Sequence, residues 1–338
     1  MKTIGCASRD SYFIDEGGGI WIIVGNKDIK QLTLSSTNNL LPRMVEVAVG
    51  DAHALFLDEN GKVWVHGKNK NLHFQTKKPS EEADLLGHRF PEGTQIVTVS
   101  CGMNHSMLLD SKGYVWGCGF NSSGQLGHLD PRRYTITKNP HLKNIRDIQA
   151  CGRFSLFLDK DSKVWICGDI VTQHNKIPCV IEGIPEIALF SGGLNFCFLI
   201  DLEGSVWCLG GNYNGQLGLG HKNEVSEPTK NEMLPPIRAC SASTFSSMFL
   251  AEDDSVWLIN ASQFSTVTIP VNITSTDSGT LPDPFTSVSC GNNYSLLLGY
   301  DGSLWERSLG IRSEFQKLAT ECKGAVFHQN HTKSARNR

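Results

Sequence analysis

Short apolar runs recur along the chain, and each of them is closed by polar turn residues. The clearest run is Ser106-Met107-Leu108-Leu109-Asp110, which is followed by Gly113 and then by Val115-Trp116. A glycine at this place supplies the positive φ angle that a tight hairpin requires, and Val and Trp favour a pleated strand. Apolar runs of this length between turn residues predict β-strands. We therefore expect an all-β protein built from a repeated hairpin.

The tryptophans mark the period of the repeat. Successive tryptophans are 43, 52, 49, 42, 50 and 48 residues apart, and all seven belong to the series: Trp21, Trp64, Trp116, Trp165, Trp207, Trp257 and Trp305. Each unit has room for three or four short strands, and one such sheet cannot bury both of its faces alone. Seven sheets packed face to face can bury them, which predicts a closed β-propeller of seven blades.

The outer strands and the domain limits follow from this architecture. Ile177-Pro178-Cys179-Val180 and Ser226-Glu227-Pro228-Thr229 are expected to be outermost strands, because a sheet edge tolerates proline. The stretch from Thr3 to Cys6 is expected to be an inner strand, with Ala325-Val326-Phe327 as the candidate for the strand that closes the ring. The expected domains are a single propeller over 1–328 and a flexible basic C-terminal tail over 329–338.

We interpret the seven tryptophans as structural wedges between neighbouring blades. An indole removes about 150–250 Å² from water, which is worth at most roughly 4–6 kcal/mol at about 25 cal/mol per Å². A ligand-stacking role is the alternative, and it is less favoured because every copy carries the tryptophan. Trp207→Ala is therefore expected to lower the free energy of unfolding by about 3–5 kcal/mol.

The residues around tryptophan separate this repeat from two others of similar period. A WD40 repeat places Asp after Trp, but the residues at that position here are Ile22, Val65, Gly117, Ile166, Cys208, Leu258 and Glu306. A kelch repeat opens every blade with a Gly-Gly pair, whereas Gly192-Gly193 and Gly210-Gly211 are isolated pairs in this chain. Neither repeat fits.

The third copy shows the full motif: Cys101-Gly102, His105-Ser106, Leu109-Asp110, Gly113, Val115-Trp116, Gly119, Asn121 and Gly124-Gln125-Leu126-Gly127. This motif resembles the RCC1 (regulator of chromosome condensation) repeat. The second Gly-Gln-Leu-Gly run, at 215–218, lies 91 residues after the first, and Trp207 lies 91 residues after Trp116. The resemblance covers residues 3 to 318 and implies a seven-bladed propeller. The other five copies lack Gly-Gln-Leu-Gly, and Ala242-Ser243 replaces Cys-Gly in the sixth, so the chain resembles a divergent member.

The charge balance bears on the class of partner. The chain has 31 Lys+Arg and 34 Asp+Glu, a formal net charge of −3. The one basic cluster apparent along the sequence is Lys333, Arg336 and Arg338, at a chain end that we expect to be solvated. We therefore expect no direct nucleic-acid binding. No apolar stretch reaches the roughly 18 residues of a membrane span. We expect a soluble, monomeric protein in the cytoplasm, with a nuclear share as an alternative.

The cysteines and histidines are phased with the repeat. Zinc would need locally convergent Cys-x-x-Cys pairs, and a nucleophilic enzyme would need a motif such as Gly-x-Ser-x-Gly; neither pattern occurs. We therefore expect no catalytic residue, no metal and no cofactor. We expect free thiols that pack as small core residues and histidines that make structural hydrogen bonds. The phased residues are Cys6, Cys101, Cys151 and Cys290 in one slot, Cys118 and Cys167 in a second, and His53 and His105 in a third.

Candidate binding residues lie where the repeat is longest, because insertions there must form surface loops. The first candidate is a polar, proline-bearing stretch over 77–84, and the second is the stretch 274–279. Solvated loops without a function are the simpler interpretation, and partner-binding loops are the alternative. The candidate residues are Lys77, Lys78, Glu81, Glu82, Asp84 and Asp277.

Two functions remain open at this point. The first is a non-catalytic scaffold that binds another protein through one face of the propeller or its loops. The alternative, implied by the resemblance, is a guanine-nucleotide exchange factor for Ran or another small GTPase. Exchange requires no nucleophile, since the factor only has to bind the nucleotide-free GTPase better than the loaded one. Family members that act on Ran carry a basic N-terminal tail, which this chain lacks, and an inserted wedge-like hairpin, for which 66–95 is the nearest candidate.

Overall fold

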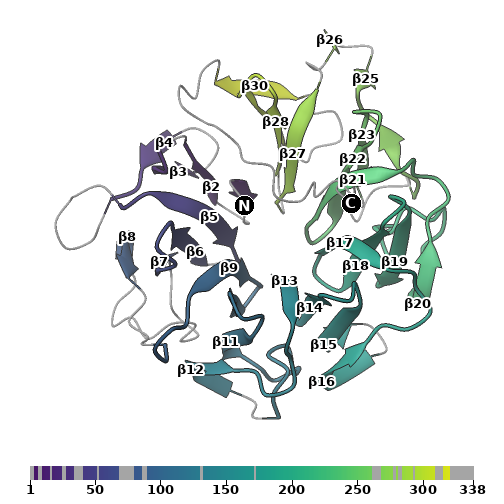
Figure 1. Cartoon of the computed structure of the whole chain (residues 1–338). Helices are drawn as coiled ribbons and strands as arrows, with labels where there is room; N and C mark the ends of the chain where they lie inside the picture. The colour runs from purple at the N-terminus through teal and green to yellow at the C-terminus, as the bar shows by residue number, and fades with distance from the viewer. Residues whose placement is uncertain are drawn as a thin grey trace, which may run out of the picture. The chain divides into compact units, whose positions relative to one another are not determined.

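The computed structural model describes residues 4–6, 10–15, 17–24, 28–33, 41–51, 53–67, 80–85, 90–129, 132–170, 173–260, 268–276, 279–280, 284–291, 294–308 and 315–319. Within these ranges every regular element is a strand, and the strands form seven four-stranded antiparallel sheets and one small hairpin (Figure 1). The protein is therefore all-β, with the seven blades of a β-propeller, as the repeat predicted. Its chain divides into two compact units, Met1–Glu182 and Gly183–Arg338.

Unit 1 holds the first four blades, and the strands of each blade pair with one another in chain order. Blade 1 is β1 (Ile4–Cys6), β2 (Asp10–Ile14), β3 (Ile20–Val24) and β4 (Asp28–Gln31). Blade 2 is β5 (Met44–Val49), β6 (His53–Asp58), β7 (Val63–Gly67) and β8 (Ser80–Leu85). Blade 3 is β9 (Ile96–Cys101), β10 (His105–Asp110), β11 (Val115–Phe120) and β12 (Arg132–Lys138). Blade 4 is β13 (Ile145–Ala150), β14 (Phe154–Asp159), β15 (Val164–Ile170) and β16 (Gln173–Val180).

Unit 2 holds the last three blades. Blade 5 is β17 (Ile187–Gly192), β18 (Phe196–Asp201), β19 (Val206–Gly210) and β20 (Val225–Lys230). Blade 6 is β21 (Ile237–Ala242), β22 (Ser246–Ala251), β23 (Val256–Asn260) and β24 (Val271–Asn272), and the hairpin β25 (Ser275–Thr276) and β26 (Gly279–Thr280) follows it. Blade 7 is β27 (Phe285–Cys290), β28 (Tyr294–Gly299), β29 (Leu304–Ser308) and β30 (Gln316–Ala319).

The strand predictions made from proline are confirmed. Ile177–Val180 lies in β16 and Ser226–Thr229 lies in β20, each the fourth strand of its blade. Residues 4–6 form β1, the first strand of blade 1. The expected closing strand over 325–327 and the tail over 329–338 lie outside the described residues.

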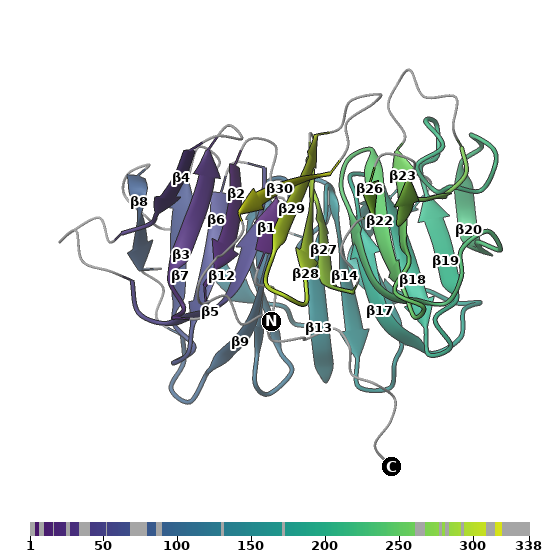
Figure 2. The ribbon, with the colours of Figure 1, turned by 90° about the horizontal axis from the view of Figure 1, so that it is seen from above.

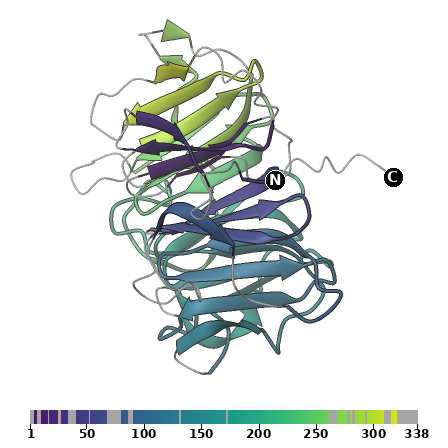
Figure 3. The ribbon, with the colours of Figure 1, turned by 90° about the vertical axis from the view of Figure 1, so that its left-hand side faces the viewer.

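The second strand of each blade carries most of the core. All six residues of β6, β10, β14, β18 and β22 are buried. A strand covered on both faces reads as a continuous apolar run, whereas a half-exposed strand alternates. Figure 3 shows why these strands are covered, because successive sheets of unit 1 pack face to face. The same sheets are seen from above in Figure 2.

A buried aspartate organises the hairpin between the second and third strands. In blade 3 the Oδ1 atom of Asp110 accepts hydrogen bonds from the backbone N–H groups of Lys112 (3.0 Å) and Tyr114 (2.9 Å). Its Oδ2 atom accepts one from Trp116 Nε1 at 3.0 Å. The carboxylate thus ties the turn to the indole of the next strand. The indole bond recurs in Asp15–Trp21, Asp58–Trp64, Asp159–Trp165 and Asp201–Trp207.

In blades 6 and 7 a serine hydroxyl replaces the aspartate as the acceptor of the indole hydrogen bond. Ala251 occupies the aspartate position of blade 6, and the Nε1 atom of Trp257 donates instead to Ser255 Oγ at 2.8 Å. The Ser255 hydroxyl donates to Asp253 in turn, and this hydrogen bond holds the pKa of Asp253 below its ordinary value. In blade 7, Trp305 donates to a serine hydroxyl at 2.9 Å in the same way. The anchoring charge has moved from a buried strand end to the exposed turn.

Several tryptophans pack against a neighbouring blade. Trp116 is 8% exposed and belongs to an apolar cluster that includes Leu55 and Val65 of blade 2. Trp165 packs on the cluster that contains Met107 of blade 3. Trp64, Trp257 and Trp305 likewise pack on clusters that span two adjacent blades. Trp21 stacks on Phe13 of its own blade with ring centroids 6.2 Å apart.

Polar side chains also connect the blades of unit 1. His53 Nε2 lies 3.0 Å from Ser106 Oγ of the next blade, and His105 Nε2 lies 2.8 Å from Ser155 Oγ. All four residues are buried. The prediction that the phased histidines make structural hydrogen bonds is confirmed.

The Gly-Gln-Leu-Gly motif builds a closed loop rather than a binding site. In blade 3 the side chain of Asn121 accepts from Leu126 N at 2.8 Å and donates to His128 O at 2.9 Å. Asn139 Nδ2 donates to Leu126 O at 2.9 Å. Blade 5 repeats the pattern with the buried Asn212 and Asn231. The polar groups of the motif are thus engaged inside the fold.

The turn of blade 4 offers a stabilising substitution. Ser162 has a φ of 60° at the position that Gly113 fills in blade 3 with a φ of 82°. Left-handed backbone is unfavourable for a residue with a Cβ atom. We expect Ser162→Gly to raise the free energy of unfolding by about 0.5–1 kcal/mol, as measured by urea denaturation. The matched control is Asp254→Gly, with a wild-type φ of 65°, which should gain less because it removes the ion pair with Arg238. An equal gain in both variants would contradict this account.

Candidate partner-binding surfaces

A metal centre and a membrane-spanning helix are the first candidate features to consider in the described ranges. No cluster of three or more His, Cys, Asp or Glu side chains in these ranges could hold a metal ion. The described part of the chain also contains no helix long and apolar enough to cross a membrane.

The buried thiols are unreactive at neutral pH. Cys101, Cys118, Cys167 and Cys197 are free and buried. Burial raises the pKa of Cys197 to about 12 and raises the pKa of Cys118 and Cys167 still further. Because the thiolate is the nucleophile and the metal ligand, a thiol with such a pKa does neither task at neutral pH. These residues pack as small core side chains, as the phasing predicted.

The first predicted loop is a strand over most of its described length. Residues 80–85 form β8, which pairs with β7 through Gly67–Ser80 and Trp64–Leu85. The interpretation of Glu81, Glu82 and Asp84 as loop residues is therefore wrong. The polar sequence of β8 suits an edge strand. Lys77 and Lys78 lie outside the described residues.

The second predicted loop contains a small hairpin. β25 and β26 pair through Ser275–Thr280 and Thr276–Gly279. Asp277, the candidate in this stretch, lies between the two strands and outside the described residues. Of the six candidate residues, the structure describes only the backbone of Glu81, Glu82 and Asp84, in β8.

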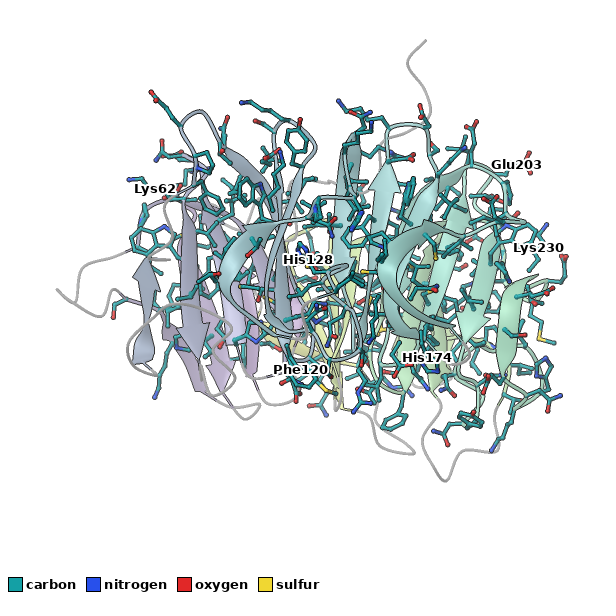
Figure 4. The ribbon with its side chains drawn as sticks, turned by 90° about the horizontal axis from the view of Figure 1, so that it is seen from below. Lys62, Phe120, His128, His174, Glu203 and Lys230 are labelled. Atoms are coloured by element: carbon teal, nitrogen blue, oxygen red, sulfur yellow. The ribbon has the colours of Figure 1, made fainter. Side chains whose placement is uncertain are left out.

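Each blade has two distinct ends. The hairpin turn between strands two and three, and the connection to the next blade, lie at one end, which we name the turn end. The opposite end, the loop end, carries the connections between strands one and two and between strands three and four. Figure 4 shows Lys62 at the turn end of unit 1, away from Phe120 and His174 at its loop end. Glu203 marks the turn end of unit 2.

The turn end of blades 3 and 4 gathers positive charge. Six exposed cations define what we name the basic turn surface: Lys112, Lys138, Lys143, Arg146, Lys160 and Lys163. The connection between the blades joins their two turns, because Ile145 N donates to Gly113 O at 3.0 Å and Lys160 N donates to Asn144 O at 2.9 Å. The cations therefore sit on one continuous stretch of surface.

Few carboxylates offset these cations. The segments 90–95, 111–114, 138–147 and 160–163 contain six cations and three carboxylates, Glu92, Asp147 and Asp161, so that 6 − 3 = +3. The nearby Asp110 and Asp159 are buried and bound to indoles. Along the sequence the basic cluster lies at the C-terminus, outside the described residues, whereas this second cluster arises because folding collects lysines up to 51 residues apart in the chain.

The turn end of unit 2 has the opposite sign. Its exposed residues Glu186, Glu203, Glu232, Glu252, Asp253 and Asp301 form an acidic turn surface. Leu202 and Tyr300, 51% and 57% exposed, occupy equivalent positions in two of its turns. Three cations also lie at this end: the exposed Lys230 and Lys317 in fourth strands, and Arg238, which is bound to Asp254 and to the backbone oxygens of Ala251 and Phe285.

Two large side chains are exposed in the described part of the loop end. Leu129 is 70% exposed, and Tyr213 is 63% exposed. The hydroxyl of Tyr213 donates to Glu224, and this hydrogen bond raises the pKa of the tyrosine. Among the described residues, the exposed charges of the basic and acidic turn surfaces make these surfaces candidates for contact with a partner.

Comparison with protein families matches the repeat directly. One model of the regulator of chromosome condensation (RCC1) repeat matches residues 203–250, and a second matches residues 44–71 and 96–125. These segments lie in blades 2, 3, 5 and 6.

Two proteins named RCC1-like G exchanging factor-like protein, from Mus musculus and Homo sapiens, are each 29% identical over 218 residues. The match covers 57% of this chain and 45% of each relative, so it spans less than half of each relative. The human probable E3 ubiquitin-protein ligase HERC6 is 30% identical over 206 residues, which cover 55% of this chain and 20% of that protein.

Solved propellers share the fold. Human WBSCR16 superposes with a TM-score of 0.72 at 19% identity, covering 86% of this chain and 84% of that one. Yeast RCC1 (Prp20), solved bound to Kap60, gives 0.71 at 17% identity over 86% and 78%. Prp20p from Saccharomyces cerevisiae, studied with its binding to Gsp1p and histones, gives 0.66 at 20% identity over 81% and 76%.

Proposed function

Because the chain is a divergent RCC1-like propeller protein, we propose that it is a non-catalytic module that binds another protein. One observation carries this proposal. The side chains of the recurrent aspartates, histidines and asparagines of the repeat form hydrogen bonds within the fold. Among the described residues, exposed charged side chains form the basic and acidic turn surfaces.

The relatives support a modular role. The alignment covers only 20% of HERC6, which means that similar repeats form part of a much larger protein. A propeller placed in different surroundings supplies a rigid surface, and its activity then depends on what it contacts. This role requires no chemistry from the chain itself.

A capture experiment tests the proposed module. The purified chain would be photo-crosslinked in lysate and its adducts identified and then reconstituted from pure components. We expect at least one protein to form a stable complex that comigrates with the chain on size exclusion. If no captured protein can be reconstituted with the pure chain, the proposed function is wrong.

A second candidate is guanine-nucleotide exchange on a small GTPase. The names of the mouse and human relatives favour it. An exchange factor works by binding the nucleotide-free GTPase more tightly than the loaded form, so the lack of a catalytic cluster in the described ranges does not count against it. Of the predicted wedge region 66–95, the described part is the end of β7, the edge strand β8 and the segment 90–95. The inserted hairpin that the structure does describe is β25–β26.

Release of fluorescent GDP from purified small GTPases, Ran included, distinguishes the two functions. An exchange factor should speed release by about tenfold or more, which corresponds to about 1.4 kcal/mol of the barrier. A protein that only binds its partner should leave the rate unchanged for every GTPase. The predicted cytoplasmic or nuclear location and the monomeric state stay predictions.

A further inference from the structure

We propose that the basic turn surface of blades 3 and 4 binds an acidic segment of a partner protein. This inference rests on the proposed function and names the contact surface and the chemistry of the partner. It starts from the positions of six cations on two adjacent turns and the connection between them.

The lysines of this surface are available to a partner. Lys112, Lys143, Lys160 and Lys163 are exposed, and none forms an ion pair with a described residue. Unpaired ammonium groups close together repel one another, and a carboxylate-rich partner relieves that repulsion. The surface is therefore complementary to a segment rich in Glu and Asp.

Arg146 and Lys138 give the surface a fixed frame. The Nε atom of Arg146 donates to Asp159 O at 3.0 Å, and its Nη2 donates to Ser162 Oγ at 3.3 Å. Lys138 Nζ lies 3.0 Å from the centroid of the Tyr114 ring. Both side chains are held against the turns, so they add positive charge without the entropy cost of ordering a free chain.

The observations favour a protein over nucleic acid as the source of the negative charge. Nucleic-acid sites usually lie on basic domains and add aromatic faces that stack on bases. This chain has a net charge of −3. Tyr114, the aromatic residue of the surface, has its ring covered by Lys138. A short acidic segment fits within a local charge of +3, whereas a long polyanion would extend beyond it.

A charge-reversal experiment tests the inference. The binding variant is Lys112→Glu/Lys143→Glu/Lys160→Glu. The matched control is Lys176→Glu/Lys222→Glu/Lys230→Glu, which changes three exposed lysines elsewhere and brings the formal charge to the same value, −3 − 6 = −9. The probe is a fluorescein-labelled peptide of alternating Glu and Gly, compared with the same peptide carrying Gln in place of Glu. Fluorescence anisotropy reports binding, and circular dichroism confirms that both variants fold.

We expect the Glu peptide to bind the wild type and the control, and the Gln peptide to bind neither. The binding variant should lose affinity by at least about tenfold, equivalent to about 1.4 kcal/mol. Added salt should weaken wild-type binding, because the Debye length shortens to about 8 Å at physiological ionic strength. Equal losses in the control and the binding variant would overturn the inference, since net charge alone would then explain them.

Two further probes cover other occupants of this surface. Duplex DNA that binds the wild type more tightly than the Glu peptide, and that the binding variant releases, would overturn the assignment to a protein. Sedimentation tests whether the chain self-associates. If added salt weakens self-association, and if it is lost both in the binding variant and in Glu252→Lys/Asp253→Lys, the surface binds a second copy of this chain and the assignment to a partner protein is wrong. Neither result is expected.

The reconstituted partner separates this inference from the proposed function. If the binding variant keeps the partner as tightly as the wild type, the surface assignment is wrong and the module proposal stands. If the wild type forms no reconstituted complex at all, the proposed function fails whatever the peptide result.

Discussion

Trp116→Ala is expected to lower the free energy of unfolding by about 4–5 kcal/mol. The indole is 8% exposed and fills a cluster shared by blades 2 and 3, where Phe90 meets it edge-on with ring centroids 5.5 Å apart. Alanine would leave a cavity between two sheets and would deprive Asp110 of the Nε1 donor. Urea denaturation followed by far-ultraviolet circular dichroism measures the loss without relying on tryptophan fluorescence.

Two companion variants identify the source of this loss. Trp116→Phe keeps most of the apolar area and removes the hydrogen bond to Asp110, so it should cost about 1–2 kcal/mol. Trp207 is only half-buried, so Trp207→Ala should cost about 3 kcal/mol, the lower end of the range expected from its sequence alone. A Trp116→Ala protein that unfolds at the wild-type urea concentration would show that the indole is not a wedge.

The blades could be predicted because the same strand and turn signals recur in several copies of the repeat. Val115-Trp116 and Val206-Trp207 begin equivalent strands, and turns such as Gly113 and Gly204 come before both. The period, the turn residues and the apolar runs all favour the same sheet, which is the consistency that specifies a fold. The strand β8 was not predicted within segment 77–84, because it is an edge strand with a polar sequence and no apolar run.

The candidate surfaces could not be predicted for a different reason. Lys112 and Lys163 are 51 residues apart, and neither is part of a basic run in the sequence. They become neighbours only because turns of adjacent blades lie at the same end. A signal was nevertheless present, since Lys112 and Lys160 fall within the same hairpin turn of successive repeats. Aligning the copies by their tryptophans and comparing turn charges would have revealed it.

The two forms of the tryptophan anchor lead to a prediction about Asp110 and Asp201. Asp110→Ala is expected to cost about 3 kcal/mol, because two backbone N–H groups and the Trp116 indole would lose their charged acceptor. Asp201→Ala should cost about half as much, about 1.5 kcal/mol. Ser205 stands four residues after Asp201, the spacing at which Ser255 follows Ala251 and accepts from Trp257 in blade 6.

The remaining difference between blades 5 and 6 supplies a rescue. Blade 6 has Asp253 beside its serine, whereas blade 5 has Glu203 at that position. Asp201→Ala/Glu203→Asp rebuilds the relay of blade 6, so this double variant should be more stable than Asp201→Ala. Asp201→Ala/Ser205→Ala removes the substitute acceptor and should match the cost of Asp110→Ala. Because the residues are in contact, the two pairs should be non-additive in a double-mutant cycle. Additive costs in both pairs would mean that the serine relay stabilises blades 6 and 7 only in their own surroundings.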